Sequence, residues 1–172
     1  MTRVNMQGAD DELAVLSRVN GNLQARFERT VEHDQQAVWS MLTETGRLAQ
    51  WLAPGAIELR LGSAANLEFI DSGTIIDSSV TALDPPRLLE YSWSSGDEPS
   101  RPVRWETRAE AGGTHVTLTI TLPQNEHVAR ACAGWEAHLT MLLAALEDVP
   151  IKFLFEHFKR TREAYKTKLA LL

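Results

Sequence analysis

The chain has 172 residues, with a hydrophobic fraction of 44% and a charged fraction of 23%, values typical of one globular domain with its own core. Its formal net charge of -6 disfavours general nucleic-acid binding, and its one cysteine, Cys132, excludes an internal disulfide. No apolar run has the length of about 20 residues that spans a bilayer. The first residues also lack the basic and then continuously apolar pattern of a secretory signal, so we expect a cytoplasmic protein.

The first part of the chain predicts a helix, a strand and two more short helices. Residues 10–19 are predicted to form a short helix, and the alternation over 22–31 predicts a half-buried strand. Asp34 is a suitable N-cap for a helix that continues to about residue 42. A second short helix is expected over about 44–50, before Pro54 and the glycine after it break the chain.

The middle of the chain predicts an antiparallel meander of strands with one apolar and one solvated face. Apolar residues alternate with polar ones in a series of short segments separated by Gly- or Pro-containing turns. The segments are 57–61, 67–69, 73–83, 89–93, 103–107 and 116–122.

The last part of the chain changes to helical periodicity. Apolar residues recur at helical spacing over 126–147, which predicts an amphipathic helix of about 33 Å. The strand over 73–83 has a similar length of about 36 Å, so the helix can cross the whole sheet. Pro150 ends this helix, and a second one is expected within 151–172. That segment has six Lys and Arg against two Glu, a net charge of +4 that leaves -10 for the rest of the chain.

Several short strings occur in a specific order along the chain. They are Val38-Trp39 to Leu42-Thr43, Leu48 to Trp51, Glu58-x-Arg60-x-Gly62, Asp84-Pro85-Pro86-Arg87-Leu88-Leu89, Tyr91-Ser92-Trp93, Gly113-Thr114-x-Val116-x-Leu118, and Gly134-Trp135 with Leu139 and Leu142. In this order they resemble the bacterial homologues of the activator of heat-shock protein 90 ATPase, a family within the superfamily of START domains and birch-pollen allergens. The sequence departs from the family at Gly62-Ser63, where a glycine pair is usual, and at 121–123, where a histidine is often found.

The resemblance implies an α+β helix-grip fold. In this fold a curved antiparallel sheet, here of about six to seven strands, wraps around a long C-terminal helix, and two short helices follow the first strand. We expect residues 23–147 to form this domain, residues 1–22 to form an N-terminal extension with the short helix, and residues 148–172 to form a C-terminal helical extension.

The fold also implies a cavity between the sheet and the long helix. Aromatic and apolar side chains that face this space are the candidate ligand-binding residues, and any of them could instead fill the core. They are Trp51, Leu52, Tyr91, Trp93, Trp105, Trp135, His138, Leu139 and Leu142. His138, three residues after Trp135 on the same helical face, could bind a ligand, act as an acid or base, or be a satisfied buried histidine.

Other chemistries have less support in the sequence. His127, Cys132 and His138 do not fall on one side of a helix, so no metal site or other cofactor is expected. Cys132 lies near the apolar face without an evident base and is interpreted as a core residue.

Three functions remain open. The first is binding of a hydrophobic or aromatic small molecule in the cavity. The second is a co-chaperone-like or regulatory protein, with a role in the stress response and a partner or a homodimer contact through the C-terminal helix. The third is a cyclase- or hydrolase-type enzyme that uses His138, although the sequence favours a protein without catalysis.

Overall fold

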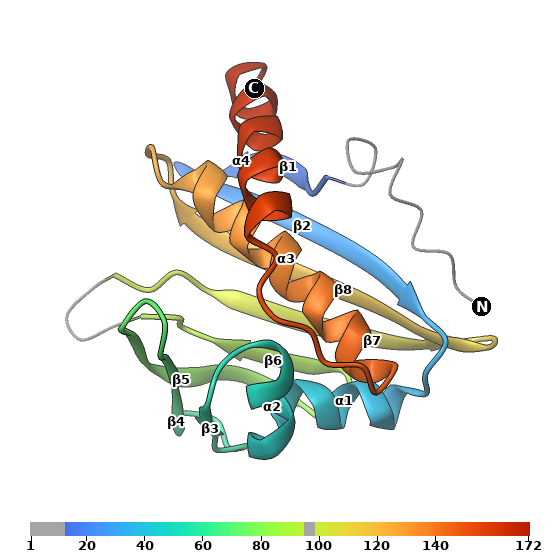
Figure 1. The fold of residues 1–172 in the computed structure, drawn as a ribbon. Helices are drawn as coiled ribbons and strands as arrows, with labels where there is room; N and C mark the ends of the chain where they lie inside the picture. Colours follow the sequence, from blue (N-terminus) through green and yellow to red (C-terminus); the bar gives the residue numbers. More distant parts are fainter. Residues whose placement is uncertain (1–12, 95–98) are drawn as a thin grey trace.

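The computed structural model describes residues 13–94 and 99–172, and it shows a long helix lying across one antiparallel sheet (Figure 1). The sheet has eight strands in the order β1-β2-β8-β7-β6-β5-β4-β3, so every pair except β2–β8 joins neighbours in the sequence. The strands are β1 Val15–Val19, β2 Asn22–Val31, β3 Gly55–Ile57, β4 Ala64–Phe69, β5 Thr74–Asp84, β6 Leu88–Tyr91, β7 Val103–Glu110 and β8 Gly113–Pro123. The helices are α1 Gln35–Thr43, α2 Thr45–Trp51, α3 Val128–Leu146 and α4 Phe155–Ala170. The α+β class and the helix-grip fold are therefore confirmed.

The core lies between the sheet and α3. Strands β2 and β8 present alternate residues to it, with Phe27 opposite Leu118 and Ala25 opposite Ile120 in the antiparallel register. Each of these four side chains is buried, as the period-2 pattern predicts for a strand with one face on the core. The buried face of α3 packs against them and closes the core, as the helical periodicity predicted.

The two short helices after β2 form where the sequence predicts them. Asp34 has extended backbone angles, and its carboxylate accepts a hydrogen bond of 2.7 Å from the backbone N–H of Ala37. This cap satisfies one of the unpaired donors at the start of α1. Helix α2 follows directly, and its last residue, Trp51, is buried with its indole N–H donating to the carbonyl of Met41 at 2.8 Å. The two helices cover one end of the sheet beside α3 (Figure 1).

The predicted helix over 10–19 is wrong for its described part. Residues 10–12 lie outside the described residues, and Val15–Val19 is strand β1, paired with β2. Asn20 and Gly21 both have positive φ values, 50° and 81°, as a two-residue hairpin turn requires. This Asn-Gly turn joins β1 to β2 and brings the number of strands to eight, above the six or seven expected.

Two strand predictions also need correction. Alternation over 57–61 predicted a strand, but β3 ends at Ile57, and Leu59 and Leu61 are exposed in the turns that follow. Trp93 was expected on the strand of Leu89 and Tyr91, but β6 ends at Tyr91 and Trp93 has a φ of 49°. In both segments the chain turns, and short alternating patterns do not show where pairing stops.

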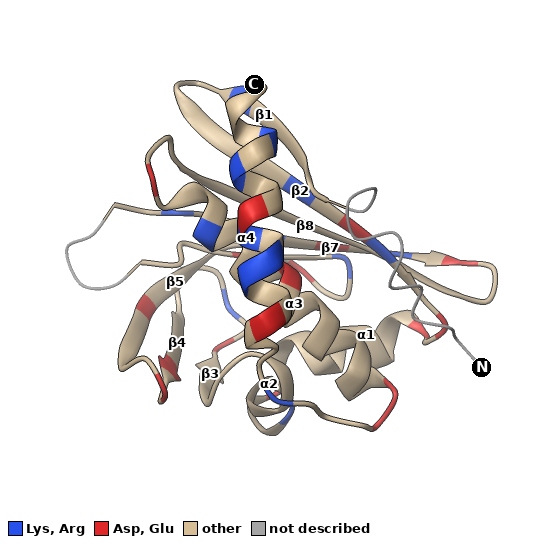
Figure 2. Ribbon diagram, turned by 45° about the horizontal axis from the view of Figure 1, so that its top comes forward, with Lys and Arg blue, Asp and Glu red and all other residues tan. Residues whose placement is uncertain are grey.

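Helix α4 packs against α3 and ends beside β1 (Figure 1). The Lys168 ammonium donates to the carbonyl of Ala14 at 2.8 Å, and Arg18 donates to the carbonyl of Leu172 at 3.3 Å. The two ends of the described chain are therefore held together. Lys and Arg recur along α4, as Figure 2 shows.

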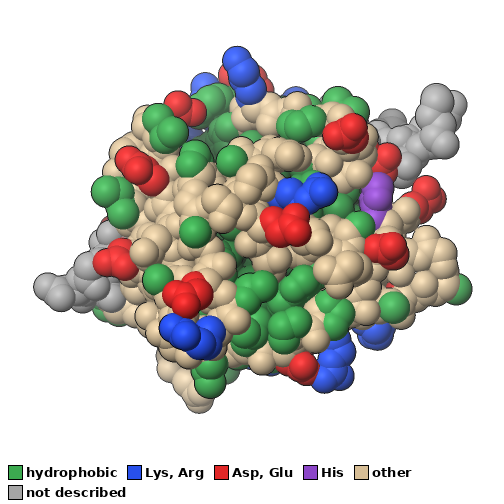
Figure 3. All heavy atoms as spheres, turned by 90° about the horizontal axis from the view of Figure 1, so that it is seen from below, with side chains coloured by type: hydrophobic (Ala, Val, Ile, Leu, Met, Phe, Trp, Pro, Cys, Tyr) green, Lys and Arg blue, Asp and Glu red, His purple; other side chains and the backbone are tan. Residues whose placement is uncertain are grey.

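The surface combines polar and apolar areas. Figure 3 views the molecule from below, on the side of α1 and α2, and shows hydrophobic side chains gathered near the middle with charged side chains around them. None of the helices in the described part of the chain is both long and apolar enough to cross a bilayer.

Candidate functional site

A pocket of about 440 Å³ lies between the N-terminal half of α3 and the sheet, and it opens to solvent. Its volume is in the range of about 300–1,000 Å³ typical of small-molecule sites. Its walls come from β4, β7, β8, α3 and the loops between them. The lining residues are Phe69, Trp93, Arg101, Val103, Ile120, Leu122, Pro123, Asn125, His127, Arg130, Ala131, Gly134, Trp135 and His138.

Aromatic rings form one wall of the pocket. The ring centres of Trp93 and Trp135 are 5.0 Å apart, and Phe69 contacts Trp93 edge-on at 5.9 Å. Such tilted and edge-on arrangements are the favourable geometries for aromatic pairs. Trp93 reaches this position because its left-handed backbone turns the chain away from β6. That conformation costs a bulky residue about 1–2 kcal/mol, so the surrounding structure must hold it in place.

Gly134 opens the wall that α3 forms. It lies in the middle of α3, and a Cβ built on it would meet no atom within 4 Å. A glycine within a helix is less stable than alanine by about 0.5–1 kcal/mol. No neighbouring atom would clash with a larger residue's Cβ at this position. The missing side chain of Gly134 therefore adds directly to the free volume of the pocket.

His138 lies at the inner end of the pocket. Its Nδ1 is 2.8 Å from the carbonyl oxygen of Trp51, and because a carbonyl can only accept, Nδ1 carries the proton. Burial lowers the pKa of His138, while the bond to Trp51 opposes this effect. The imidazole is therefore neutral, and its Nε2, which has no hydrogen-bond partner among the described residues, presents a lone pair. The rings of Phe69 and Phe153 lie 5.8 and 5.5 Å from it.

The nine residues predicted to bind a ligand divide into two groups. Trp93, Trp135 and His138 line the pocket. The other six pack in the core, where they are almost completely buried: Trp51, Leu52, Tyr91, Trp105, Leu139 and Leu142. Buried polar atoms in this group are paired, since the Trp105 indole N–H donates to the Tyr91 hydroxyl at 3.0 Å. Ligand contact by any of the nine stays a prediction.

Sequence reasoning missed other lining residues. Phe69 was assigned only to a short apolar run, and Arg130 was not considered. Gly134 was noted in the family pattern but not as part of a site. A glycine between two apolar stretches of a long helix is a visible signal, because it costs stability without an evident turn.

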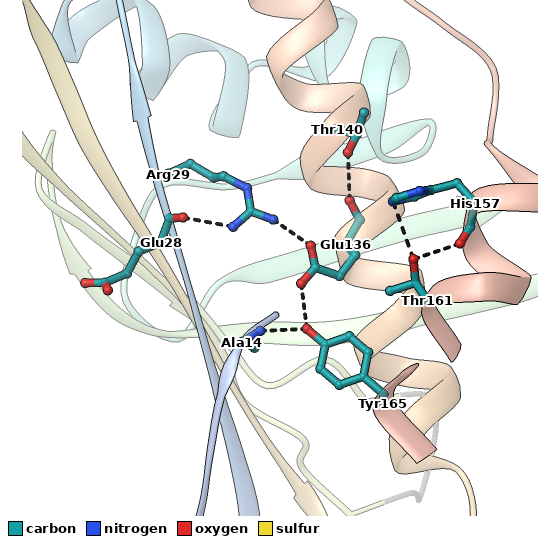
Figure 4. Close-up of polar contacts among 8 residues, drawn as sticks. All are labelled: Ala14, Glu28, Arg29, Glu136, Thr140, His157, Thr161 and Tyr165. Carbon is teal, nitrogen blue, oxygen red and sulfur yellow. Dashed lines mark hydrogen bonds and ion pairs between the residues drawn. The ribbon is translucent and has the colours of Figure 1, made fainter. Parts of the chain in front are cut away.

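A second polar cluster lies on another face of α3 (Figure 4). The Glu136 carboxylate accepts from the Arg29 guanidinium and from the Tyr165 hydroxyl, both at 2.5 Å. The same hydroxyl accepts from the backbone N–H of Ala14 at 2.8 Å. Burial raises the pKa of Glu136, against the lowering effects of Arg29 and Tyr165. The cluster thus joins β2, α3, α4 and the residue before β1.

Cys132 is buried near this cluster, and its thiol is a poor nucleophile. Burial and the charge of Glu136 raise its pKa to about 12. Among the described residues, no group of three or more His, Cys, Asp and Glu is placed to hold a metal ion.

Over residues 32–147 the sequence matches the family described as Activator of Hsp90 ATPase homolog 1-like protein. The chain belongs to this family. The match begins directly after β2 and ends just beyond α3, so every residue that lines the pocket lies within it. A comparison with curated proteins gives no significant match.

Solved structures share the helix-grip fold of this family member. EF2215 of Enterococcus faecalis, a conserved protein of unknown function, is 22% identical with a TM-score of 0.79, over 96% of this chain and 95% of its own. DynU16 of the dynemicin biosynthetic locus is 27% identical with a TM-score of 0.68, over 74% of this chain and 48% of its own. The Aha1 dimer of Colwellia psychrerythraea is 19% identical with a TM-score of 0.61, over 72% of this chain and 96% of its own.

Proposed function

We propose that the chain binds an aromatic small molecule in the pocket beside Trp93, Trp135 and Gly134. The observation that carries this proposal is Gly134, a helix-interior glycine whose absent side chain leaves the pocket open although nothing nearby would clash with a Cβ. The left-handed Trp93 supports it, because strain retained at a pocket wall is typical of a functional site. The similarity to DynU16, a protein of a biosynthetic locus, also favours a small-molecule ligand.

Binding without catalysis is the form of this proposal that the lining residues support. None of the described residues that line the pocket is Asp or Glu, so this part of the chain gives His138 no carboxylate to act as a second acid or base. The enzyme hypothesis would require the ligand itself to supply that group. A role in the stress response and contact with a chaperone stay predictions.

Filling the pocket from Gly134 tests the proposal. Leucine at this position would extend into the free volume, whereas alanine would add one methyl group and leave most of the pocket open. We expect 4-hydroxybiphenyl to quench the tryptophan fluorescence of the wild-type protein and of Gly134→Ala. Gly134→Leu should fold with unchanged circular dichroism and show at least tenfold weaker binding. Equal affinity of all three proteins, or no quenching in any of them, would contradict the proposal.

A second candidate function is self-association through α4. The segment 151–172 has a net charge of +4 against -10 for the rest of the chain, so the helix of one copy complements the body of another. Arg160 is exposed on α4 and has no ion pair among the described residues. The related Aha1 protein of Colwellia psychrerythraea is described as a dimer. Light scattering should show a dimer that dissociates in Arg160→Glu and at high salt, and a monomer under all conditions would exclude this function.

A further inference from the structure

The polar groups of the pocket are distributed unevenly, and this distribution bears on which aromatic molecule fits. The inference depends on the proposed function, because it concerns the ligand of the same pocket. Arg130 lines the side near the N-terminal end of α3 together with Arg101 and His127, and no acidic residue is among the described lining residues. In a chain with a net charge of -6, the guanidinium of Arg130 on a wall whose described residues include no Asp or Glu favours an anionic ligand group.

Arg130 is the strongest candidate among these groups. It is exposed in the first turn of α3, and no ion pair engages it within the described part of the chain. His127 is less available, since its Nε2 lies 3.4 Å from the Glu126 carboxylate. The guanidinium of Arg130 can therefore form a bidentate pair with an incoming carboxylate.

Helical spacing fixes the distance between the two polar ends of the pocket. Arg130, Gly134 and His138 are at positions i, i+4 and i+8 of α3, and all three line the pocket. Arg130 and His138 are thus about 12 Å apart along the helix axis, with the gap at Gly134 between them. That length corresponds to a molecule with two linked or fused rings.

The inner end of the pocket requires a hydrogen-bond donor. His138 lines the pocket and donates from Nδ1 to Trp51, so of its two ring nitrogens only Nε2, with its lone pair, remains for a ligand. A second anionic group would be repelled by this lone pair, and a cationic group would find no acidic partner among the described lining residues. A hydroxyl on the distal ring is neutral and donates, so it complements His138.

We propose that the ligand is an elongated aromatic acid with a hydroxyl group at the end opposite its carboxylate. The hydroxyl donates to Nε2 of His138, the rings lie in the gap at Gly134 against Trp93 and Trp135, and the carboxylate pairs with Arg130. The order of these groups along α3 determines the orientation of the ligand, with its acid end toward solvent.

Calorimetric titration with three matched probes tests this ligand class. The full probe is 4′-hydroxybiphenyl-4-carboxylate, biphenyl-4-carboxylate lacks its hydroxyl, and 4-hydroxybiphenyl lacks its carboxylate. The wild-type protein should bind the full probe about tenfold more tightly than either truncated probe. Arg130→Gln should abolish the preference for the carboxylate, and His138→Phe should abolish the preference for the hydroxyl.

Arg26→Gln is the charge-matched control, since Arg26 is exposed on β2, between the inward-facing Ala25 and Phe27, and should leave all three affinities unchanged. Because each variant is compared across probes, a general loss of folding cannot imitate a loss of preference. Equal binding of all three probes to the wild-type protein would overturn this ligand class while leaving aromatic binding intact. Failure of every probe to bind would overturn both.

Discussion

Replacing Tyr165 by phenylalanine should destabilise the fold more than removing the hydroxyl of the equally buried Tyr91. Tyr165 is fully buried, and its hydroxyl donates to the Glu136 carboxylate while accepting from the N–H of Ala14. A hydrogen bond to a charged group contributes about 1.5–3 kcal/mol, and a buried N–H left unpaired costs about 1–3 kcal/mol. Because Arg29 still pairs with Glu136, we expect a total loss of about 3 kcal/mol. For a domain of this size that lowers the Tm by about 6–12 °C.

The only other tyrosine provides a matched control. Tyr91 is equally buried, but its hydroxyl accepts one neutral bond from Trp105, so Tyr91→Phe should cost only about 1 kcal/mol. Urea unfolding of the two variants and the wild-type protein measures both losses. Hydrogen exchange should also show reduced protection in α4 and β1 of Tyr165→Phe alone. A loss in Tyr165→Phe no larger than that in Tyr91→Phe would refute the stabilising role of the cluster.

Three further predictions concern single positions. Gly134→Ala should raise the free energy of unfolding by about 0.5–1 kcal/mol, measured by urea unfolding, and a loss would show that the added Cβ has no free space. Gly113→Ala should lower it by about 1–3 kcal/mol, because the new Cβ would lie 2.0 Å from the carbonyl oxygen of Val31; an unchanged Tm would contradict this. Burial lowers the pKa of His138 below its ordinary 6.5. As the pH falls through 6.5, the His138 side chain therefore binds a proton in the unfolded chain before it does so in the folded protein, and the free energy of unfolding decreases. His138→Gln should lack this decrease in unfolding measured between about pH 5 and 8, and an identical pH dependence in both proteins would count against a neutral His138.

Much of the fold follows from local patterns. Alternation identified β2 and β8, and helical periodicity identified α3, because burial of one face imposes a period on the sequence. Strand β1 was missed because its apolar residues also fit a short helix, and its exposed Val15 weakens the alternation. The decisive signal was the turn at Asn20, where a two-residue hairpin requires positive φ.

The pocket was predictable only in part. Periodicity shows that Trp105 and Trp135 face inward, but it does not show whether neighbouring side chains fill the space between them. Whether the space stays open depends on Trp93, which lies beyond the end of β6, and on Gly134. The free volume that Gly134 leaves becomes visible only when the position of α3 on the sheet is known. The contact of Arg29 with Glu136 joins residues 107 positions apart, so no local pattern could reveal it.

The central claim is that an aromatic molecule occupies the pocket beside α3, and an NMR titration with 4-hydroxybiphenyl tests it most directly. Chemical-shift changes should be largest at the backbone amide of Gly134 and at the indole N–H groups of Trp93 and Trp135, which line the pocket. Signals from α4 should move little, because α4 contributes no residue to the lining. Changes centred on α4, or none at saturating probe, would contradict the claim.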